Sequence, residues 1–266
     1  MDDDNDIVAA GRTAELLAYG VGRVLKLYRE GFPAEAAKEE FRVSTEVYRS
    51  GFSVPRPFEM TVRDGRAGIV YEKAEGMTML AAISRDPSAV KEEARRMARL
   101  HAEIHNRQVE GLPRQKTVLA RLISEAPFLS EEEKSRITHM LEQLEDDCRL
   151  CHGDYHPDNI ILGQKEWVID WMTAVSGSPA ADAARTVLLL KFGTLPDEMP
   201  SAAQQFFTRI REQLTNMYWD EYQKLTGISS VEIERWMVPV AAARLTEWIP
   251  AKEKEQLLAL IRKQIS

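Results

Sequence analysis

The sequence of 266 residues holds little cysteine, no long apolar run and no excess of positive charge. Its two cysteines, Cys148 and Cys151, cannot build a disulfide framework and favour a reducing compartment. No apolar stretch is long enough to cross a bilayer, so we expect no membrane span. The opening residues, MDDDNDIVAAG, are acidic where an export signal is basic. Together these absences favour a cytoplasmic protein.

The charge balance is mildly acidic, with a formal net charge of -7 at pH 7. Phosphate backbones repel a chain of this sign, so we expect no nucleic-acid partner, whereas a cationic small molecule is compatible with it. Hydrophobic residues make up 44% of the chain, which is enough for a sizeable core and argues against disorder. The length suits one large domain or two lobes, and we expect a monomer or a dimer.

The first part of the chain predicts a small sheet with one inserted helix. Residues 11–28 read as a hairpin with a glycine-rich turn, and residues 58–72 read as a second hairpin that turns at Asp64-Gly65. Residues 33–50 suit a helix, because a proline begins them and a glycine follows them.

The rest of the chain predicts mostly helices. Helical spacing of apolar residues or capping residues mark five segments: residues 88–105, 130–147, 201–225, 230–248 and 250–265. One strand-like island interrupts them, since residues 159–170 contain two apolar runs around a glycine-containing turn and read as a short hairpin. We therefore predict an α+β fold with an N-terminal sheet lobe, residues 1–73, and a larger helical C-terminal lobe, residues 74–266.

A short polar loop leads into this hairpin. The stretch LCHGDYHPDNIIL, residues 150–162, gathers two histidines, two aspartates and an asparagine between apolar flanks. Phosphoryl transfer needs such groups: a carboxylate that accepts the proton of a substrate hydroxyl, and hard oxygen ligands for magnesium. Asp154 supplies the first, and Asn159 and Asp170 supply the others. A tight hairpin returns Asp170 beside Asn159, so that both reach one ion while the buried flanks hold them still.

Two metal-centred interpretations compete with this one. Cys148-x-x-Cys151-His152 formally matches the pattern for covalent haem attachment, but we expect that match to be accidental in a cytoplasmic chain. His101 and His105 stand at the spacing of a zinc protease helix, yet such a site needs a glutamate directly after the first histidine, where this chain has alanine. We expect His101 to be a hydrogen-bonded core residue.

The polar loop also carries a family resemblance. His152-x-Asp154 followed by Asn159 matches the catalytic-loop pattern H-x-D-x-x-x-x-N of protein kinases. The fuller HGDYHPDN, followed by VIDW, resembles the aminoglycoside phosphotransferase and choline kinase family more closely, from about residue 6 to about residue 190. The resemblance implies a bilobal, protein-kinase-like fold that binds ATP and magnesium and phosphorylates a hydroxyl of a small molecule, with Asp154 as the catalytic carboxylate.

The same resemblance assigns residues to the nucleotide. Lys26 in RVLKLY matches the sheet lysine that contacts the phosphates. Glu40 in KEEFR matches the helix glutamate that pairs with this lysine, with Glu39 as the competing choice. Tyr71 and Glu72 end a strand that leads into the hinge, where backbone groups bind adenine.

The turn over the phosphates departs from the protein-kinase pattern, because it holds the single Gly11 in place of three glycines. Such turns are common in the small-molecule kinases. Gly11 allows close backbone approach and Thr13 donates to a phosphate, with a plain hairpin turn as the alternative. Downstream, SGSPAADAAR resembles a family segment whose acidic position is Asp182. We expect Asp182 and His152 to support the polar loop.

The charge around the polar loop also bears on the acceptor. Acidic residues near the loop favour a cationic acceptor, such as an aminoglycoside or an amino alcohol, while choline, thiamine, homoserine and sugars stay open. Large aromatic residues line either the acceptor pocket or the core; they are Trp171, Phe206, Phe207, Tyr218, Trp219 and Tyr222. Glu247 lies at the acceptor or at the surface, Asp158 lies near the metal or faces solvent, and His156 orients the loop. A protein kinase and a nucleotide-binding pseudokinase are the alternative functions.

Overall fold

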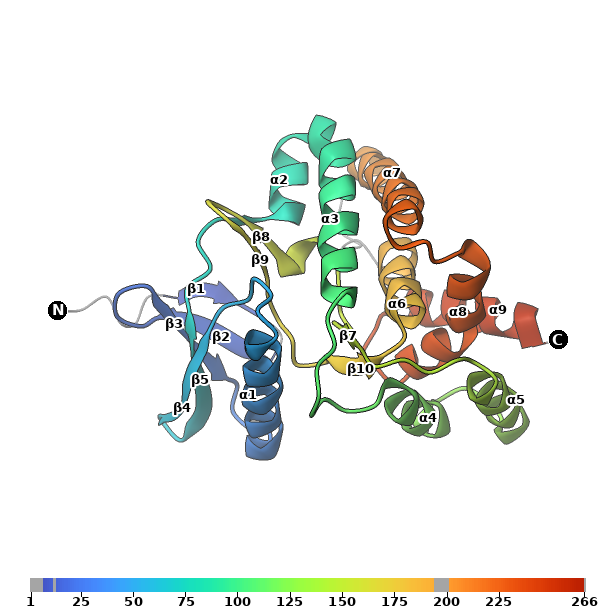
Figure 1. Cartoon of the computed structure of the whole chain (residues 1–266), viewed down its shortest axis with the longest axis horizontal. Helices are drawn as coiled ribbons and strands as arrows, with labels where there is room; N and C mark the ends of the chain where they lie inside the picture. The colour runs from blue at the N-terminus through green and yellow to red at the C-terminus, as the bar shows by residue number, and fades with distance from the viewer. Residues whose placement is uncertain (1–6, 12, 194–200, 266) are drawn as a thin grey trace. The chain divides into compact units, whose positions relative to one another are not determined.

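The computed structural model describes residues 7–11, 13–193 and 201–265. The chain divides into two compact units. The sheet unit consists of Met1–Thr78 with Asp158–Thr173, and the helical unit consists of Met79–Pro157 with Ala174–Ser266. Figure 1 shows most of the strands in the first unit and most of the helices in the second, which confirms the predicted α+β class.

The sheet unit is built on five antiparallel strands in the order β1-β2-β3-β5-β4. Their bounds are β1 Ile7–Ala10, β2 Ala14–Ala18, β3 Arg23–Tyr28, β4 Pro57–Arg63 and β5 Arg66–Glu72. Both predicted hairpins are confirmed, as β2–β3 and β4–β5. At the second turn, Asp64 and Gly65 have φ values of 51° and 74°, which is the conformation that a two-residue hairpin favours and that glycine tolerates.

Strand β3 presents different residues to the two faces of the sheet. Leu25 and Leu27 belong to the apolar cluster on one face, whereas Tyr28 belongs to a cluster on the other. Helix α1, Ala34–Arg49, contributes Ala37 to the second cluster and packs against β4 and β5. Because side chains alternate along a strand, Lys26 shares the helix-covered face with Tyr28.

A short hairpin joins the sheet unit from a later part of the chain. Strands β8, Ile160–Leu162, and β9, Glu166–Val168, pair with each other, and β6, Met77–Thr78, pairs with β8. Gly76 and Gly163 let the backbones approach closely, since a Cβ on either glycine would overlap the backbone of the other segment. The predicted hairpin is confirmed, and these glycines fix where it sits.

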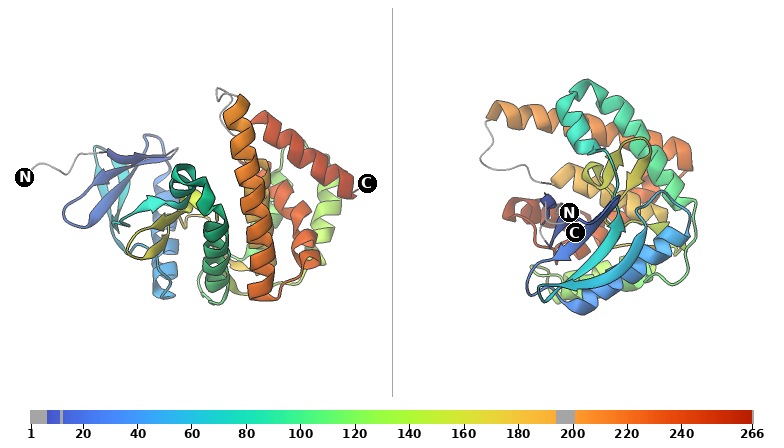
Figure 2. Two further views of the ribbon diagram at one scale, coloured as in Figure 1. Left: turned by 90° about the horizontal axis from the view of Figure 1, so that it is seen from above. Right: turned by 90° about the vertical axis from the view of Figure 1, so that its left-hand side faces the viewer.

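The helical unit contains long helices around a short two-stranded ladder, β7 Arg149–Cys151 with β10 Val175–Gly177. The helices are α2 Met79–Arg85, α3 Val90–His105, α4 Gln115–Glu125, α5 Glu131–Glu142, α6 Pro179–Phe192, α7 Ser201–Thr226, α8 Ser230–Arg244 and α9 Ala251–Ile265. Helix α3 packs along α7, as the views in Figure 2 show, and α6 packs against α8. The predicted capping box at Ser130 is confirmed, because its side chain and that of Glu133 bond reciprocally to each other's backbone.

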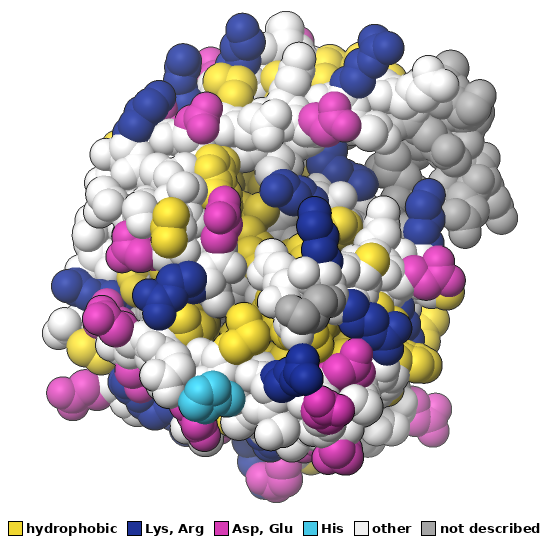
Figure 3. All heavy atoms as spheres, turned by 90° about the vertical axis from the view of Figure 1, so that its right-hand side faces the viewer, with side chains coloured by type: hydrophobic (Ala, Val, Ile, Leu, Met, Phe, Trp, Pro, Cys, Tyr) yellow, Lys and Arg dark blue, Asp and Glu magenta, His cyan; other side chains and the backbone are white. Residues whose placement is uncertain are grey.

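The outer face of the helical unit carries charges of both signs. Figure 3 shows Lys and Arg interspersed with Asp and Glu over the side that bears α5, α8 and α9. Among the described residues, no helix combines the length and the apolar character that a bilayer span requires.

Replacing Gly163 by alanine tests the close approach that docks the β8–β9 hairpin. The added Cβ would overlap the backbone of Glu75, which no side-chain rotation relieves. We expect Gly163→Ala to lower the free energy of unfolding by about 1–3 kcal/mol, as overpacking does, measured by urea denaturation. Gln164→Ala, an exposed residue of the same turn, is the matched control and should stay within about 0.5 kcal/mol of wild type. Equal losses in both variants would contradict this packing.

Candidate active site

Lys26 of β3 lies between two carboxylates in the sheet unit. Its Nζ is 2.7 Å from Oε1 of Glu40 on α1 and 3.0 Å from Oδ1 of Asp170, which follows β9. Burial alone would lower the pKa of Lys26, but the carboxylates of Asp170 and Glu40 outweigh burial and raise this pKa. The lysine is therefore a fixed positive charge at neutral pH.

The structure distinguishes the two candidate glutamates. Glu40 is 3% exposed and reaches Lys26, whereas Glu39 is half exposed and pairs with Arg42 at 2.6 Å. Because the two residues are successive on a helix, they point about 100° apart, and one of them faces the sheet. The pairing of Lys26 is thus with Glu40.

Two tyrosines complete the surroundings of Glu40. The hydroxyl of Tyr28 donates to Oε2 at 2.5 Å, and the hydroxyl of Tyr71 donates to Oε1 at 3.4 Å. Burial raises the pKa of both tyrosines, and the Glu40 carboxylate raises it further, so both hydroxyls stay protonated and act as donors. The two hydroxyls hold the Glu40 carboxylate in place beside the Lys26 ammonium.

The β8–β9 hairpin brings Asn159 and Asp170 together along the backbone. The amide of Ile169 donates to the carbonyl of Asn159 at 3.0 Å, so that Asp170 is one residue beyond the partner of Asn159. Asp170 has φ 63°, a left-handed conformation that is uncommon for residues other than glycine. This conformation breaks the alternation of the strand at the point where the carboxylate reaches Lys26. Asn159 is buried and Asp170 is 39% exposed.

The remaining nucleotide-site candidates lie in the same unit. Gly11 and Thr13 belong to the turn between β1 and β2, where the amide of Gly11 donates to Ala14 at 2.8 Å. The backbone amide of Glu72 donates to the carbonyl of Arg56 at 2.8 Å, so this amide is already hydrogen-bonded within the sheet unit. Their contacts with a nucleotide stay predictions.

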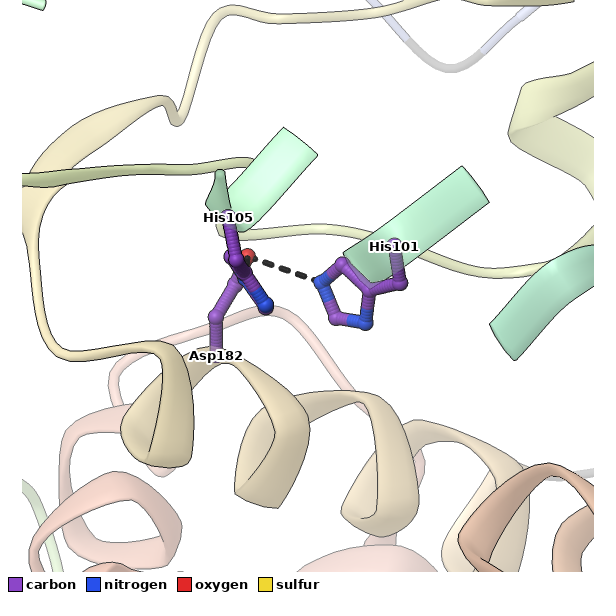
Figure 4. A group of neighbouring side chains, drawn as sticks. All are labelled: His101, His105 and Asp182. Carbon is purple, nitrogen blue, oxygen red and sulfur yellow. Dashed lines mark hydrogen bonds and ion pairs between the residues drawn. The ribbon is translucent and has the colours of Figure 1, made fainter. Parts of the chain in front are cut away.

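Asp182 organises the polar loop in the helical unit. Its Oδ2 accepts the amide of His152 at 2.6 Å, and its Oδ1 accepts the amide of Gly153 at 2.8 Å. The imidazoles of His101 and His105 also meet Oδ2, with their Nε2 atoms at 3.0 and 3.2 Å (Figure 4). Asp182 is 1% exposed, and the predicted support of the loop is confirmed. Burial would raise its pKa, but the two histidines hold this pKa well below its ordinary value.

The second ring nitrogen of each of these histidines has a hydrogen-bond partner as well. His101 Nδ1 lies 2.7 Å from the hydroxyl of Tyr218, and His105 Nδ1 lies 2.6 Å from that of Tyr222. Both tyrosines are fully buried, so they belong to the core. The three side chains stand close enough to ligate a metal ion, yet each ligand atom already has a hydrogen-bond partner. This confirms the prediction of a hydrogen-bonded His101.

Asp154 stands in the supported loop with cationic or ionisable groups around it. The ring Nδ1 of His152 accepts the amide of Asp154 at 3.1 Å, which confirms that His152 supports the loop. His156 Nε2 is 3.6 Å from Oδ2 of Asp154, and Arg185 Nη2 is 3.5 Å from Oδ1. Burial would raise the pKa of Asp154, but His156 and Arg185 lower it well below the ordinary value. Asp154 is thus an ionised, 32% exposed carboxylate.

The sequence did not reveal Arg185 as a site residue. It follows Asp182 by three positions on α6, so both project from one side of that helix, and this spacing is the signal that was available. The structure also places Glu247 against Arg185 at 2.6 Å, so its carboxylate is paired with an arginine beside the loop. Asp158 is exposed, and Trp171 is buried with its indole donating to Val168.

The chain is similar to known proteins in sequence and in structure. The model of a family described as "phosphotransferase enzyme family" matches residues 10–222. No curated protein matches the chain. A thermostable mutant of the aminoglycoside phosphotransferase APH(4)-Ia, in a ternary complex with AMP-PNP and hygromycin B, is similar in structure. Its TM-score is 0.68 at 13% identity, over 97% of this chain and 93% of that one.

Two further solved structures are similar. APH(3'')-Id from Streptomyces rimosus, in complex with ADP and streptomycin, gives a TM-score of 0.60 at 18% identity, over 91% of this chain and 93% of that one. The macrolide 2'-phosphotransferase MphH from Brachybacterium faecium gives 0.51 at 20% identity, over 94% and 89%. At these identities the likeness shows a shared fold.

The buried His101 predicts how stability depends on pH. Burial and the neighbouring His105 lower the pKa of His101 from 6.5 to about 3. The unfolded chain, with an ordinary histidine, therefore binds a proton that the folded chain does not, and unfolding is favoured as the pH falls below about 6.5. We expect His101→Gln to reduce the slope of unfolding free energy between about pH 6.5 and pH 5, measured by urea denaturation.

The matched control is His139→Gln, because His139 is 73% exposed. It should leave this slope as it is in wild type. A slope that is the same in His101→Gln and wild type would show that His101 does not hold its low pKa in the folded protein.

Proposed function

Because the chain belongs to the phosphotransferase enzyme family, we propose that it transfers the γ-phosphoryl group of ATP to a hydroxyl of a small molecule. The observation that carries the proposal is the contact of Lys26 with both Glu40 and Asp170, at 2.7 and 3.0 Å. This contact joins a sheet lysine, a helix glutamate and a loop aspartate in the arrangement that binding of a metal–nucleotide complex requires.

The sheet unit is the proposed nucleotide lobe. The ammonium of Lys26 binds phosphate oxygens, and Glu40 keeps it from turning away. The turn of Gly11 and Thr13 covers the phosphates, and the chain after Tyr71 and Glu72 provides the backbone groups for adenine. The similar structures with AMP-PNP or ADP bound support a nucleotide ligand for this fold.

Magnesium fits the residues at the two ends of the β8–β9 hairpin. Asn159 and Asp170 offer an amide oxygen and a carboxylate, which are the hard ligands that magnesium prefers. One lysine between two carboxylates leaves an excess of negative charge at this point, and Asp170 is accessible. Magnesium bound here would neutralise charge on the phosphates and orient them. Asn159 and Asp170 are the residues that would hold it.

Asp154 is the proposed catalytic residue. Its low pKa makes it a weak base toward a free hydroxyl, so it first accepts a hydrogen bond that orients the hydroxyl oxygen toward the phosphorus. As the bond between the hydroxyl oxygen and the γ-phosphorus forms, the bond from that phosphorus to the β-phosphate oxygen breaks and ADP leaves, while the hydroxyl becomes acidic and its proton passes to Asp154. Positioning and electrostatic stabilisation then supply most of the rate.

The proposed acceptor is a cationic, hydroxylated small molecule such as an aminoglycoside or an amino alcohol. The net charge of -7 favours such an acceptor, and two of the similar structures contain hygromycin B or streptomycin. We propose that the protein acts in the cytoplasm as a monomer or a dimer and uses ATP and magnesium.

A panel of acceptors tests the proposed function. The purified chain is incubated with magnesium and γ-labelled ATP in the presence of aminoglycosides, choline, ethanolamine, thiamine, homoserine, sugars or a protein substrate. We expect label on a hydroxyl of a cationic small molecule. Nucleotide binding without transfer to any acceptor would indicate a pseudokinase, and label on protein would indicate a protein kinase.

Asp154→Asn tests the catalytic carboxylate. The amide keeps the shape but cannot take up a proton, so we expect kcat to fall by about 10²- to 10⁴-fold. The dissociation constant for ATP should stay within roughly threefold of wild type, because the nucleotide residues are untouched. Asp158→Asn, an exposed aspartate of the same loop, is the matched control and should keep wild-type kcat. Full activity in Asp154→Asn would remove Asp154 from its role.

Asp170→Asn tests the metal site without disturbing the backbone. Asparagine tolerates the left-handed conformation as aspartate does, so the variant keeps the backbone and removes the charge that is offered to magnesium and to Lys26. We expect the magnesium concentration for half-maximal activity to rise by at least about 10-fold, because losing even an outer-shell partner of a metal ligand costs about 10- to 100-fold. Asp64→Asn, at the other left-handed aspartate, is the matched control and should show no rise. Equal magnesium dependence in both variants would place the metal elsewhere.

A further inference from the structure

Arg185 makes three contacts around the polar loop. Its Nε donates to the carbonyl of Gly153, its Nη2 lies 3.5 Å from Oδ1 of Asp154, and its Nη1 lies 2.6 Å from Oε1 of Glu247. The side chain is 17% exposed. One planar group thus grips the backbone before Asp154, the Asp154 carboxylate itself and a carboxylate from the far end of the chain. Only a guanidinium has donors in the fixed fork that this arrangement needs.

Glu247 is also held by a second arginine. Its Oε2 lies 2.9 Å from Nη1 of Arg244, so each of its oxygens meets a different arginine. Arg244 in turn donates to Glu253 of α9, with Nε at 3.0 Å and Nη2 also in contact. Arg244 and Glu253 are 5% and 3% exposed in their side chains. The charges alternate in sign from Asp154 to Glu253, so each member compensates its neighbours.

This series of ion pairs restricts the conformations that the Arg185 side chain can adopt. Burial would lower the pKa of Arg185, but Glu247 and Asp154 raise it, so the guanidinium stays charged. An arginine held by one carboxylate could follow Asp154 as it moves. An arginine held by a backbone carbonyl and by a pinned glutamate instead gives Oδ1 of Asp154 a fixed anchor. Oδ2 of Asp154 lies on the other side of the carboxylate, 3.6 Å from Nε2 of His156.

We propose that Arg185 is a positioning residue for phosphoryl transfer, held in place by Glu247, Arg244 and Glu253. Since Arg185 acts through Asp154, this inference rests on the proposed function. It assigns the segment from α8 to α9 a part in the reaction: its ion pairs set the orientation of the catalytic carboxylate. Glu247, for which the sequence left a place at the acceptor or at the surface open, serves on this view to hold Arg185.

A positioning role predicts a split between kcat and KM. Misplacing a catalytic group costs up to about 100-fold in rate, so we expect Arg185→Met to lower kcat by about 10- to 100-fold. The KM for ATP should stay within roughly threefold, since an interaction needed in the transition state is lost and nucleotide binding is not. Arg185→Lys should recover little of kcat, because one ammonium cannot span the three contacts.

Glu247→Gln tests the anchor behind Arg185. The amide keeps one hydrogen bond to Arg185 but loses the charge, so we expect kcat to fall by about 3- to 10-fold with an unchanged KM for ATP. In the background of Arg185→Met the same substitution should have no further effect on kcat, because residues that act as one unit are not additive. Should Arg185→Met not fold, Glu247→Gln alone decides, since it leaves Arg185 in place.

The matched control is Arg114→Met. Arg114 lies in the same unit and bridges a carboxylate and a hydroxyl, Asp146 at 2.8 Å and Ser176 at 3.3 Å. We expect it to keep wild-type kcat. All variants are compared with the acceptor found active for wild type, and the melting temperature of each is measured beside its kinetics.

The outcomes separate the two proposals. An active wild type with wild-type kcat in folded Arg185→Met, or in Glu247→Gln, overturns the positioning role and leaves the proposed function standing. Independent, additive effects of the Arg185 and Glu247 substitutions also overturn it. A wild type that transfers phosphate to no acceptor refutes the proposed function, and the positioning role falls with it.

Discussion

The ammonium of Lys26 joins strand β3 both to the nearby helix α1 and to a residue from a much later part of the sequence. It bonds to Glu40 on α1 and to Asp170 after β9, which is 144 residues away along the chain. A lysine side chain that is 14% exposed needs compensating charge, because removing an ammonium from water is costly unless it is paired. Tyr28 holds the carboxylate of Glu40 in place. The ammonium of Lys26 is therefore paired with a carboxylate whose position is fixed. The proposed metal and nucleotide site depends on this fixed charge.

The helical unit also contains a buried charge that its neighbours compensate, and here the charge is the carboxylate of Asp182. Asp182 accepts two backbone amides of the polar loop and faces two imidazoles, so a fully buried negative charge is satisfied by four donors. The loop that carries Asp154 is therefore tied to α6 by its backbone, whereas Arg185 of the same helix reaches the side chain of Asp154. One helix thus fixes both the path of the loop and the direction of the carboxylate.

The sequence predicted the elements that local signals specify. The hairpins follow from turn residues, α1 and α5 from caps and periodicity, and the pairing of Lys26 with an acidic residue of α1 from the family resemblance. Helix α6 was missed because it is buried on nearly all sides, so its apolar residues show no helical stripe. The tyrosines on Glu40 and the ion pairs of Arg185 were also missed. The spacing from Asp182 to Arg185 indicates a shared side of α6, but the partners themselves come from other elements, and no local pattern specifies those contacts.

The proposed metal and nucleotide site is tested most directly by a crystal structure of the protein with manganese and a non-hydrolysable ATP analogue, with data recorded at the manganese absorption edge. Manganese takes the oxygen ligands that magnesium takes and gives an anomalous signal of its own. We expect the anomalous peak between the oxygens of Asn159 and Asp170, with Lys26 on a phosphate oxygen and still paired with Glu40. A peak away from both residues, or a nucleotide that Lys26 does not reach, would contradict the proposed site and the chemistry built on it.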